Sequence, residues 1–278
     1  MWYHRAEAAY RWVEHLSACD AQARHHARSL ILVAHPDDES VGIGGRLHRL
    51  GEVWIAYLTT GVSTAAKPEA REQQALQRRH ELQAALKIAQ VPTSRAIGLS
   101  TVGEHEAPSQ LVYLVTQLEM LLEGLEPDVV VTHPYEGGHA DHDAAAFIAR
   151  AVLLRLRRRQ HSCPALLEMA SYHDSSGQLQ SGSFATGPGG RGKAALLTAP
   201  EQERKCAMLD CFSSRSQALE NVTREFERFR AAPPVSFRQL PHPTPPRRER
   251  AAPPLHGERF RSLATDAART LEVAEFLL

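Results

Sequence analysis

The chain has 278 residues, of which 43% are hydrophobic and 23% charged, a composition typical of a globular protein that buries a core. Lysine plus arginine and aspartate plus glutamate both number 32, so no net field draws the protein to nucleic acid or to an anionic membrane. The four cysteines lack CxxC spacing, which argues against a zinc knuckle or a redox pair. No apolar run approaches a membrane span and no signal sequence opens the chain, so we expect a cytoplasmic protein.

Strand-like and helix-like segments alternate along the first two thirds of the chain. An amphipathic pattern at residues 5–27 predicts a helix ahead of the first strand. Buried-strand patterns then occupy 29–34, 52–58, 94–99, 127–133 and 165–172, and helical patterns lie between them at 41–50, 68–89, 108–125 and 143–158. This alternation predicts an α/β fold with a Rossmann-like, mostly parallel sheet and helices on both of its faces.

The pattern changes after residue 175. A glycine- and serine-rich stretch at 175–193 predicts a hairpin or a mobile loop, and 200–230 predict one or two charged amphipathic helices. The proline- and arginine-rich stretch 238–257 predicts irregular structure, and the last residues a closing helix. We therefore expect three regions: an N-terminal helical extension (1–28), a main domain (29–235) and a less regular C-terminal extension packed on that domain (236–278).

The segment AHPDDES, residues 34–40, follows the first predicted strand and places two aspartates side by side. Adjacent carboxylates repel and raise each other's pKa, so Asp37 and Asp38 need a cation or a proton between them. Ligands of parallel α/β sheets bind beyond the carboxyl ends of the strands, which is where this segment lies. The alternative is structural, since Asp38 or Ser40 could cap the helix that follows.

A second motif, HPYEGGHADHD at 133–143, follows the fourth predicted strand. If the two loops lie at neighbouring strand ends, His35, Asp38 and His142 converge. Two imidazoles and one carboxylate suit zinc with a fourth position left for water, and the same trio suits iron(II) or another divalent metal. Taken alone, two histidines at this spacing often lie on a solvated helix turn, so the hypothesis depends on both motifs together.

The remaining polar groups of the two motifs have natural roles around such a metal. Asp37 would stay unligated and accept the proton of the metal's water as general base. His139 could stabilise an oxyanion or protonate a leaving amine, and Asp141 or Asp143 could orient an imidazole. A metal, a base and an acid together indicate hydrolysis of an amide or an ester.

The segments AHPDDESVGIGG and HPYEGGHADHD resemble the two signatures of the PIG-L-type zinc-dependent de-N-acetylases. The first signature is present without change, and in the second Ala140 replaces the usual proline. The resemblance extends over roughly residues 29–235. It implies that His35, Asp38 and His142 bind zinc, that Asp37 is the general base and that His139 assists the tetrahedral intermediate.

The resemblance also implies a substrate class, an N-acetylated amino sugar, while two departures leave the particular sugar and aglycone open. Thr59-Thr60-Gly61 stands where many members have Thr-Asp-Gly, and Gly137-Gly138 stands where some members carry a tyrosine, with Tyr135 further back. Arg78 belongs to a matching R-x-x-E helix. It could contact a substrate hydroxyl or phosphate, or form a helix-surface pair with Glu81.

We therefore expect a metal-dependent hydrolase that removes the N-acetyl group from a glucosamine-type sugar or its conjugate, with zinc as cofactor. One alternative is a deacylase of an N-acylated natural product such as a glycopeptide or an aminoglycoside. Another is a non-catalytic sugar- or metal-binding homologue. GIGG at 42–45 does not match a GxGxxG fingerprint, which disfavours a dinucleotide enzyme and indicates close helix packing. Assembly into a homo-oligomer is compatible with the sequence.

Overall fold

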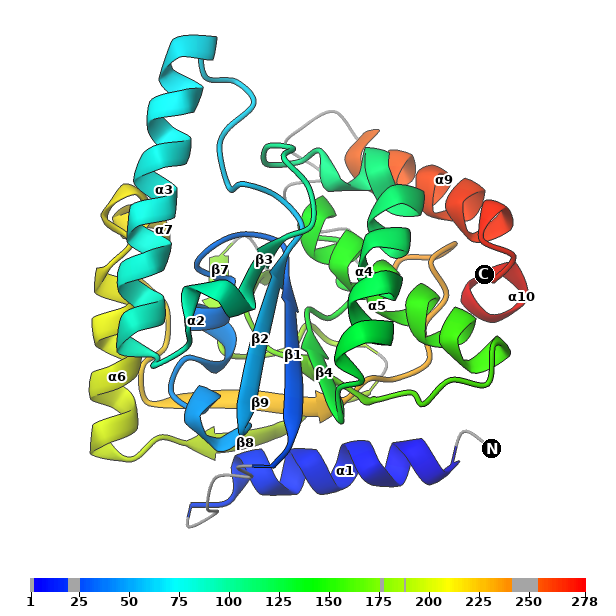
Figure 1. The fold of residues 1–278 in the computed structure, drawn as a ribbon, viewed down its shortest axis with the longest axis horizontal. Coiled ribbons are helices and arrows are strands. Elements are labelled where there is room, and N and C mark those ends of the chain that lie inside the picture. The colour runs from blue at the N-terminus through cyan, green and yellow to red at the C-terminus, as the bar shows by residue number, and fades with distance from the viewer. Residues whose placement is uncertain (1–2, 20–25, 176–177, 188, 242–254) are drawn as a thin grey trace.

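The computed structural model describes residues 3–19, 26–175, 178–187, 189–241 and 255–278. Through the first two thirds, strands and helices alternate as the sequence predicts (Figure 1). The elements of this part are α1 (Tyr3–Ser17), β1 (Arg28–Val33), α2 (Asp38–Ile43), β2 (Glu52–Tyr57), α3 (Pro68–Ile88), β3 (Ala96–Gly98), α4 (Leu111–Leu125), β4 (Val129–Thr132), α5 (Ala140–Arg158) and β5 (Ala165–Met169). Short 3-10 turns stand at Leu47–Arg49 (η1), Thr93–Arg95 (η2) and Ala107–Gln110 (η3).

Within the described residues, seven strands form one sheet in the order β3-β2-β1-β4-β5-β9-β8. The first five are parallel, and β1 lies between β2 and β4, with Leu32 opposite Thr132 across the β1–β4 pair. The expected Rossmann-like, mostly parallel sheet is confirmed. The chain passes from β1 to β2 on one side and later returns to β4 on the other, so the strand order reverses between β1 and β4. That reversal is where ligands bind in such sheets.

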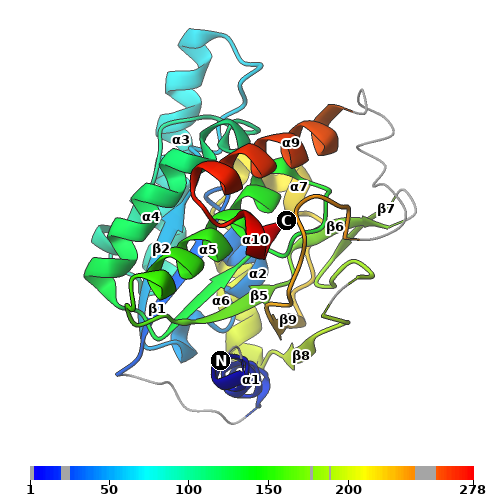
Figure 2. The same cartoon turned by 90° about the vertical axis from the view of Figure 1, so that its right-hand side faces the viewer.

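Both faces of the sheet are covered, which follows from the pattern of β1. Its residues are almost all buried and alternate between two cores, with Leu30 and Leu32 facing one and Ile31 and Val33 facing the other. The helices α4, α5 and α9 (Leu255–Thr270) pack on the first face (Figure 1, Figure 2). The helices α1, α2, α3 and α6 (Ala199–Asp210) pack on the second.

The second part of the chain adds an antiparallel edge to the sheet, and this corrects one expectation. Its remaining elements are β6 (Tyr172–Ser175), β7 (Gln178–Ser181), β8 (Lys193–Leu196), η4 (Ser213–Arg215), α7 (Ser216–Leu219), β9 (Phe226–Ala231) and α10 (Ala274–Leu277). Residues 200–230 were expected to be helical throughout, yet 226–231 form β9, antiparallel to β5 and β8. The charged residues of FERFRA fit the predicted amphipathic helix, but in the structure Glu227 and Arg230 are buried in ion pairs with Lys205 and Glu168.

The helix after β1 is shorter than the predicted segment 41–50. It begins at Asp38, so Asp38 lies in the first turn, and Asp37 occupies the N-cap position without capping through its side chain. Close packing accounts for its glycines, as expected. A Cβ on Gly42 would lie 2.5 Å from Met169 Sδ, and one on Gly45 would lie 2.7 Å from a methyl carbon of Leu197.

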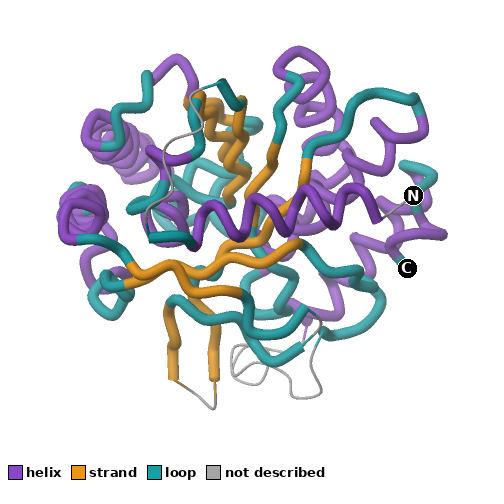
Figure 3. The backbone as a smooth tube through the Cα atoms, turned by 90° about the horizontal axis from the view of Figure 1, so that it is seen from below, coloured by secondary structure: helices purple, strands orange, loops and turns teal. Residues whose placement is uncertain are grey.

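Both terminal extensions pack on the main body. α1 crosses the sheet beside β5, β9 and β8 (Figure 3) and ends at Ser17, earlier than predicted. The hairpin β6–β7 meets the expectation of a hairpin in the glycine- and serine-rich stretch, and a closing helix is present as α9. The irregular structure expected at 238–257 falls mostly on 242–254, outside the described residues. In the described part of the chain, no helix is both long and apolar enough to cross a membrane.

Candidate metal centre

The two sequence motifs lie side by side at the carboxyl ends of the central strands. AHPDDES leaves β1 and enters α2, while HPYEGGHADHD leaves β4 and enters α5, and β1 pairs directly with β4. The chain turns sharply between β1 and α2 because Asp37 adopts a φ of 136°, a backbone region that non-glycine residues rarely occupy. Strained residues of this kind concentrate at functional sites.

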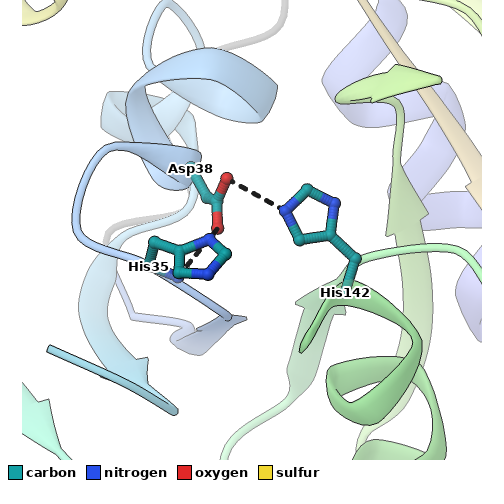
Figure 4. Close-up of side chains that lie close together, drawn as sticks. All are labelled: His35, Asp38 and His142. Atoms are coloured by element: carbon teal, nitrogen blue, oxygen red, sulfur yellow. Dashed lines mark hydrogen bonds and ion pairs between the residues drawn. The ribbon is translucent and has the colours of Figure 1, made fainter. Parts of the chain in front are cut away.

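His35, Asp38 and His142 converge as predicted, and all three are buried (Figure 4). One donor atom from each lies within 4.8 Å of the others. His35 Nδ1 lies 3.3 Å from Asp38 Oδ2, and His142 Nε2 lies 3.4 Å from Asp38 Oδ1. Neighbouring ligand atoms of a tetrahedral zinc ion with bonds of about 2.0–2.2 Å are roughly 3.3–3.6 Å apart. Each imidazole therefore lies at about this distance from one oxygen of the Asp38 carboxylate, His35 from Oδ2 and His142 from Oδ1.

The hydrogen bonds of His35 leave one nitrogen for a metal. Nε2 lies 2.9 Å from Asp141 Oδ2, and because a carboxylate only accepts, the ring proton sits on Nε2. Nδ1 is buried without a hydrogen-bond partner among the described residues. Burial lowers the pKa of His35, but the nearby carboxylates of Asp141 and Asp38 outweigh burial and raise the pKa to about 10. The surroundings therefore favour positive charge at this nitrogen, which a divalent cation would supply.

Asp141 orients His35 and is itself held by the backbone. Besides His35, its carboxylate accepts the N–H groups of His105 at 2.6 Å and Ala107 at 3.2 Å. Burial opposes ionisation, but these hydrogen bonds lower the pKa of Asp141 overall. A second donor group, formed by His35, His139 and Asp141, is equally close, but both of its Asp141 oxygens are already hydrogen-bonded. The group with Asp38 is therefore the better metal site.

Asp143 has a different position from Asp141. Its Oδ1 accepts the N–H groups of Glu136 and Gly137, each at 3.0 Å, and so fixes the loop that precedes α5.

Asp37 lies beside the ligand group and contacts two guanidinium groups. Its Oδ2 is 3.3 Å from Arg78 Nη2 and 3.4 Å from Arg215 Nε. Burial raises the pKa of Asp37, while Arg78 and Arg215 oppose that rise and hold the carboxylate by one oxygen. The other oxygen, Oδ1, is in neither ion pair, which suits a base beside the metal.

Arg78 is buried and not on the helix surface, while its contact with a substrate stays a prediction. It is only 4% exposed and donates to the carbonyl of Pro36 at 2.6 Å as well as facing Asp37. Its pair with Glu81 exists at 3.8 Å but is buried, and Glu81 mainly accepts hydrogen bonds from Ser213 and Ser214. Arg78 therefore ties α3 to the β1–α2 loop.

His139 stands at the N-cap of α5 with its ring against the ligands. Its Nδ1 accepts the N–H of Asp141 at 3.3 Å, so the neutral ring carries its proton on Nε2. The ring stacks on His142 at 4.5 Å and meets His35 edge-on at 4.9 Å. Burial, followed by the nearby His142 and His35, holds the pKa of His139 well below its usual value. A neutral imidazole with an N–H donor suits oxyanion stabilisation.

Tyr135, a candidate substrate contact or supporting residue from its place in the second motif, lies in the core. It is 2% exposed, its ring packs on Phe237 with centroids 4.6 Å apart, and its hydroxyl donates to the carbonyl of Gln239 at 3.0 Å. It anchors the start of the C-terminal extension.

Four further residues near the site were not predicted from the motifs. His133 stacks on His142, Tyr172 Oη lies 3.5 Å from His142 Nε2, His105 stacks on His139, and Arg215 pairs with Asp37. His133 ends the β4 segment inside the quoted motif, so its position carried a signal. Arg215 reaches the site from η4, and only tertiary packing brings it there.

The fold and the site define a Rossmann-like α/β protein with a His₂Asp group that could hold a metal ion at the strand-order reversal. Residues 30–153 match the family model described as GlcNAc-PI de-N-acetylase (PIG-L), and the resemblance seen in the two motifs is confirmed. A curated relative, the probable N-acetyl-alpha-D-glucosaminyl L-malate deacetylase 2 of Bacillus subtilis, is 29% identical over 140 residues. That match covers 47% of this chain and 61% of the relative's length.

Solved structures of similar fold support the same architecture. The A40926 pseudoaglycone deacetylase Dbv21 is 16% identical with a TM-score of 0.52, and the match covers 74% of this chain and 96% of that one. The N,N'-diacetylchitobiose deacetylase of Pyrococcus horikoshii is 19% identical with a TM-score of 0.51, over 82% of this chain and 92% of that one. At these identities the likeness shows the fold.

Proposed function

We propose that this protein is a metal-dependent hydrolase that removes the N-acetyl group from a glucosamine-type amino sugar or its conjugate. The observation that carries the proposal is the buried group His35, Asp38 and His142 with the unligated Asp37 beside it. The family match over 30–153 and the name of the Bacillus subtilis relative support the reaction and the substrate class.

His35 Nδ1, Asp38 and His142 Nε2 would hold the metal, for which zinc is our first choice and iron(II) our second. When bound, the metal would act as a Lewis acid toward the amide carbonyl and lower the pKa of water. Asp141 keeps the proton of His35 on Nε2 and so keeps Nδ1 available.

Asp37 would accept a proton from the attacking water through Oδ1, because Arg78 and Arg215 hold Oδ2. His139 would donate its Nε2–H to the oxygen of the tetrahedral intermediate. Proton transfer from the Asp37 carboxyl to the nitrogen would then release the amine and acetate, which returns Asp37 to its starting form.

An acetate-release assay tests the proposal. The full-length chain, loaded with zinc or iron(II), would be offered N-acetylglucosamine, its 1-phosphate, N,N'-diacetylchitobiose and an N-acylated glycopeptide. We expect release from at least one N-acetylglucosamine compound, its loss with a chelator and its return on adding metal. Release from the glycopeptide alone would favour the natural-product alternative. Metal binding without release from any compound would favour a non-catalytic binding protein.

A further inference from the structure

His133 is a fully buried histidine at the end of β4 to which the proposed mechanism gives no role. We propose that His133 is a positioning residue for the metal site, which holds two of its three ligands, Asp38 and His142, in their binding orientation. This inference rests on the proposed metal site, and it concerns metal affinity as well as activity.

The first contact is with Asp38. His133 Nε2 lies 3.3 Å from Asp38 Oδ2, and the same oxygen accepts the backbone N–H of His35 at 2.8 Å. The Ala34 N–H is directed at the same nitrogen at 3.3 Å, so Nε2 either accepts from Ala34 or donates to Asp38. We assign the tautomer that donates from Nε2, because the charge of the carboxylate strengthens that hydrogen bond. Because Oδ2 accepts both hydrogen bonds, Oδ1, which faces His142 Nε2 at 3.4 Å, is the oxygen available to the metal. Hydrogen bonding of this kind is how ligating carboxylates are oriented.

The second contact is with His142. The two rings stack with centroids 3.9 Å apart and an interplanar angle of 14°. The ring of His139 stacks on His142 as well, at 4.5 Å and 24°. Parallel rings packed this closely restrict rotation of the His142 imidazole, so Nε2 stays directed at Asp38. A ligand that is already oriented loses less conformational freedom when the metal binds.

His133 directly follows a strand in the centre of the sheet. Thr132, the residue before it, is paired with Leu32 in the centre of the sheet, and its hydroxyl donates to the carbonyl of Leu32 at 2.9 Å. Among the described residues, His133 belongs to neither of the two groups of donor atoms that lie mutually within 4.8 Å, so we assign it an action on the metal through its neighbours.

Two substitutions separate the two contacts. His133→Phe keeps a ring for stacking but removes the donor, and His133→Gln keeps an N–H donor but removes the ring. His161→Gln is the matched control, because His161 is an exposed histidine just past the C-terminal end of α5, whereas His142 lies in the first turn of that helix. Zinc affinity of each full-length, metal-free protein would be measured against a chromophoric chelator. The visible spectrum of the cobalt(II) form would report the ligand geometry.

We expect zinc affinity to fall roughly 10–100-fold in each His133 variant, with a changed cobalt(II) spectrum, and to stay unchanged in the control. An effect in only one variant would assign the role to that contact and still support the proposal. Wild-type affinity and spectrum in both His133 variants, or in the glutamine variant if the phenylalanine variant does not fold, would overturn it. Wild-type protein that binds no metal would instead overturn the proposed function.

Discussion

The strained backbone of Asp37 leads to a stability prediction that two substitutions isolate. Asp37 has φ 136° and ψ −26°, a backbone conformation that is strained for a residue with a Cβ and accessible to glycine. Asp37→Ala and Asp37→Gly both remove the carboxylate, and both leave Arg78 and Arg215 without it. The two variants therefore differ mainly in what a Cβ costs at this φ.

The size of the difference follows from two opposing effects. A non-glycine residue in such a backbone region costs roughly 1–3 kcal/mol. Glycine avoids this cost but raises the entropy of the unfolded chain, which lowers the stability of the glycine variant by about 0.4–1 kcal/mol. We therefore expect the glycine variant to be about 0.5–2 kcal/mol more stable than the alanine variant, a difference of a few degrees in Tm.

Thermal and urea unfolding of the two metal-free variants measures this difference without any contribution from a bound metal. We also expect neither variant to release acetate, because both lack the base. An alanine variant that is as stable as the glycine variant, or more stable, would show that the Asp37 backbone is not strained.

Three further substitutions test other parts of the site and its support. Arg215→Ala should lower kcat/KM about tenfold while zinc content stays constant, because it removes one of two cations that hold Asp37; a loss below threefold would contradict that role. Glu168→Leu should lower the free energy of unfolding in urea by ~3–5 kcal/mol, because Glu168 pairs with two buried arginines, Arg150 at 2.5 Å and Arg230 at 2.6 Å. A loss below about 1 kcal/mol would contradict this. Burial raises the pKa of Glu136 to about 8, so the folded state keeps a proton that the unfolded state loses near pH 4.5, and stability falls as pH rises through 8. Between pH 6 and pH 9, the Tm of Glu136→Gln should therefore fall less than the Tm of the wild type. Equal decreases in Tm would argue against a neutral Glu136.

The parallel part of the fold was predictable because its strands are buried on both faces and read as continuous apolar runs. SLILV (29–33) and VVV (129–131) contain no polar residue after Ser29, and turn or helix signals bound them. The antiparallel strand β9 was missed because its charged residues face buried partners. In a linear sequence, Arg230 looks like a solvated residue, and Glu168, its partner, is 62 positions away.

The site residues could be predicted where they lie close together in the sequence. His35, Asp37 and Asp38 fall within four consecutive residues at a strand end, and His142 falls in a motif at the next strand of the sheet. Arg215 could not be found in this way, because the packing of α6 and η4 over α3 brings it to Asp37. The burial of Arg78 could not be predicted for a similar reason, because tertiary packing places its guanidinium over the ring of Phe212 and against the carbonyl of Pro36.

The most direct measurement is acetate release by metal-loaded Asp37→Asn beside metal-loaded wild type, on whichever N-acetylglucosamine compound the wild type cleaves. Asparagine keeps the shape of the side chain and tolerates positive φ better than most residues, so the site should keep its metal. We predict equal metal content and a loss of release of at least 100-fold, as expected when a general base is removed. Turnover near the wild-type rate with metal bound would contradict the assignment of Asp37 as the base and the hydrolytic site built around it.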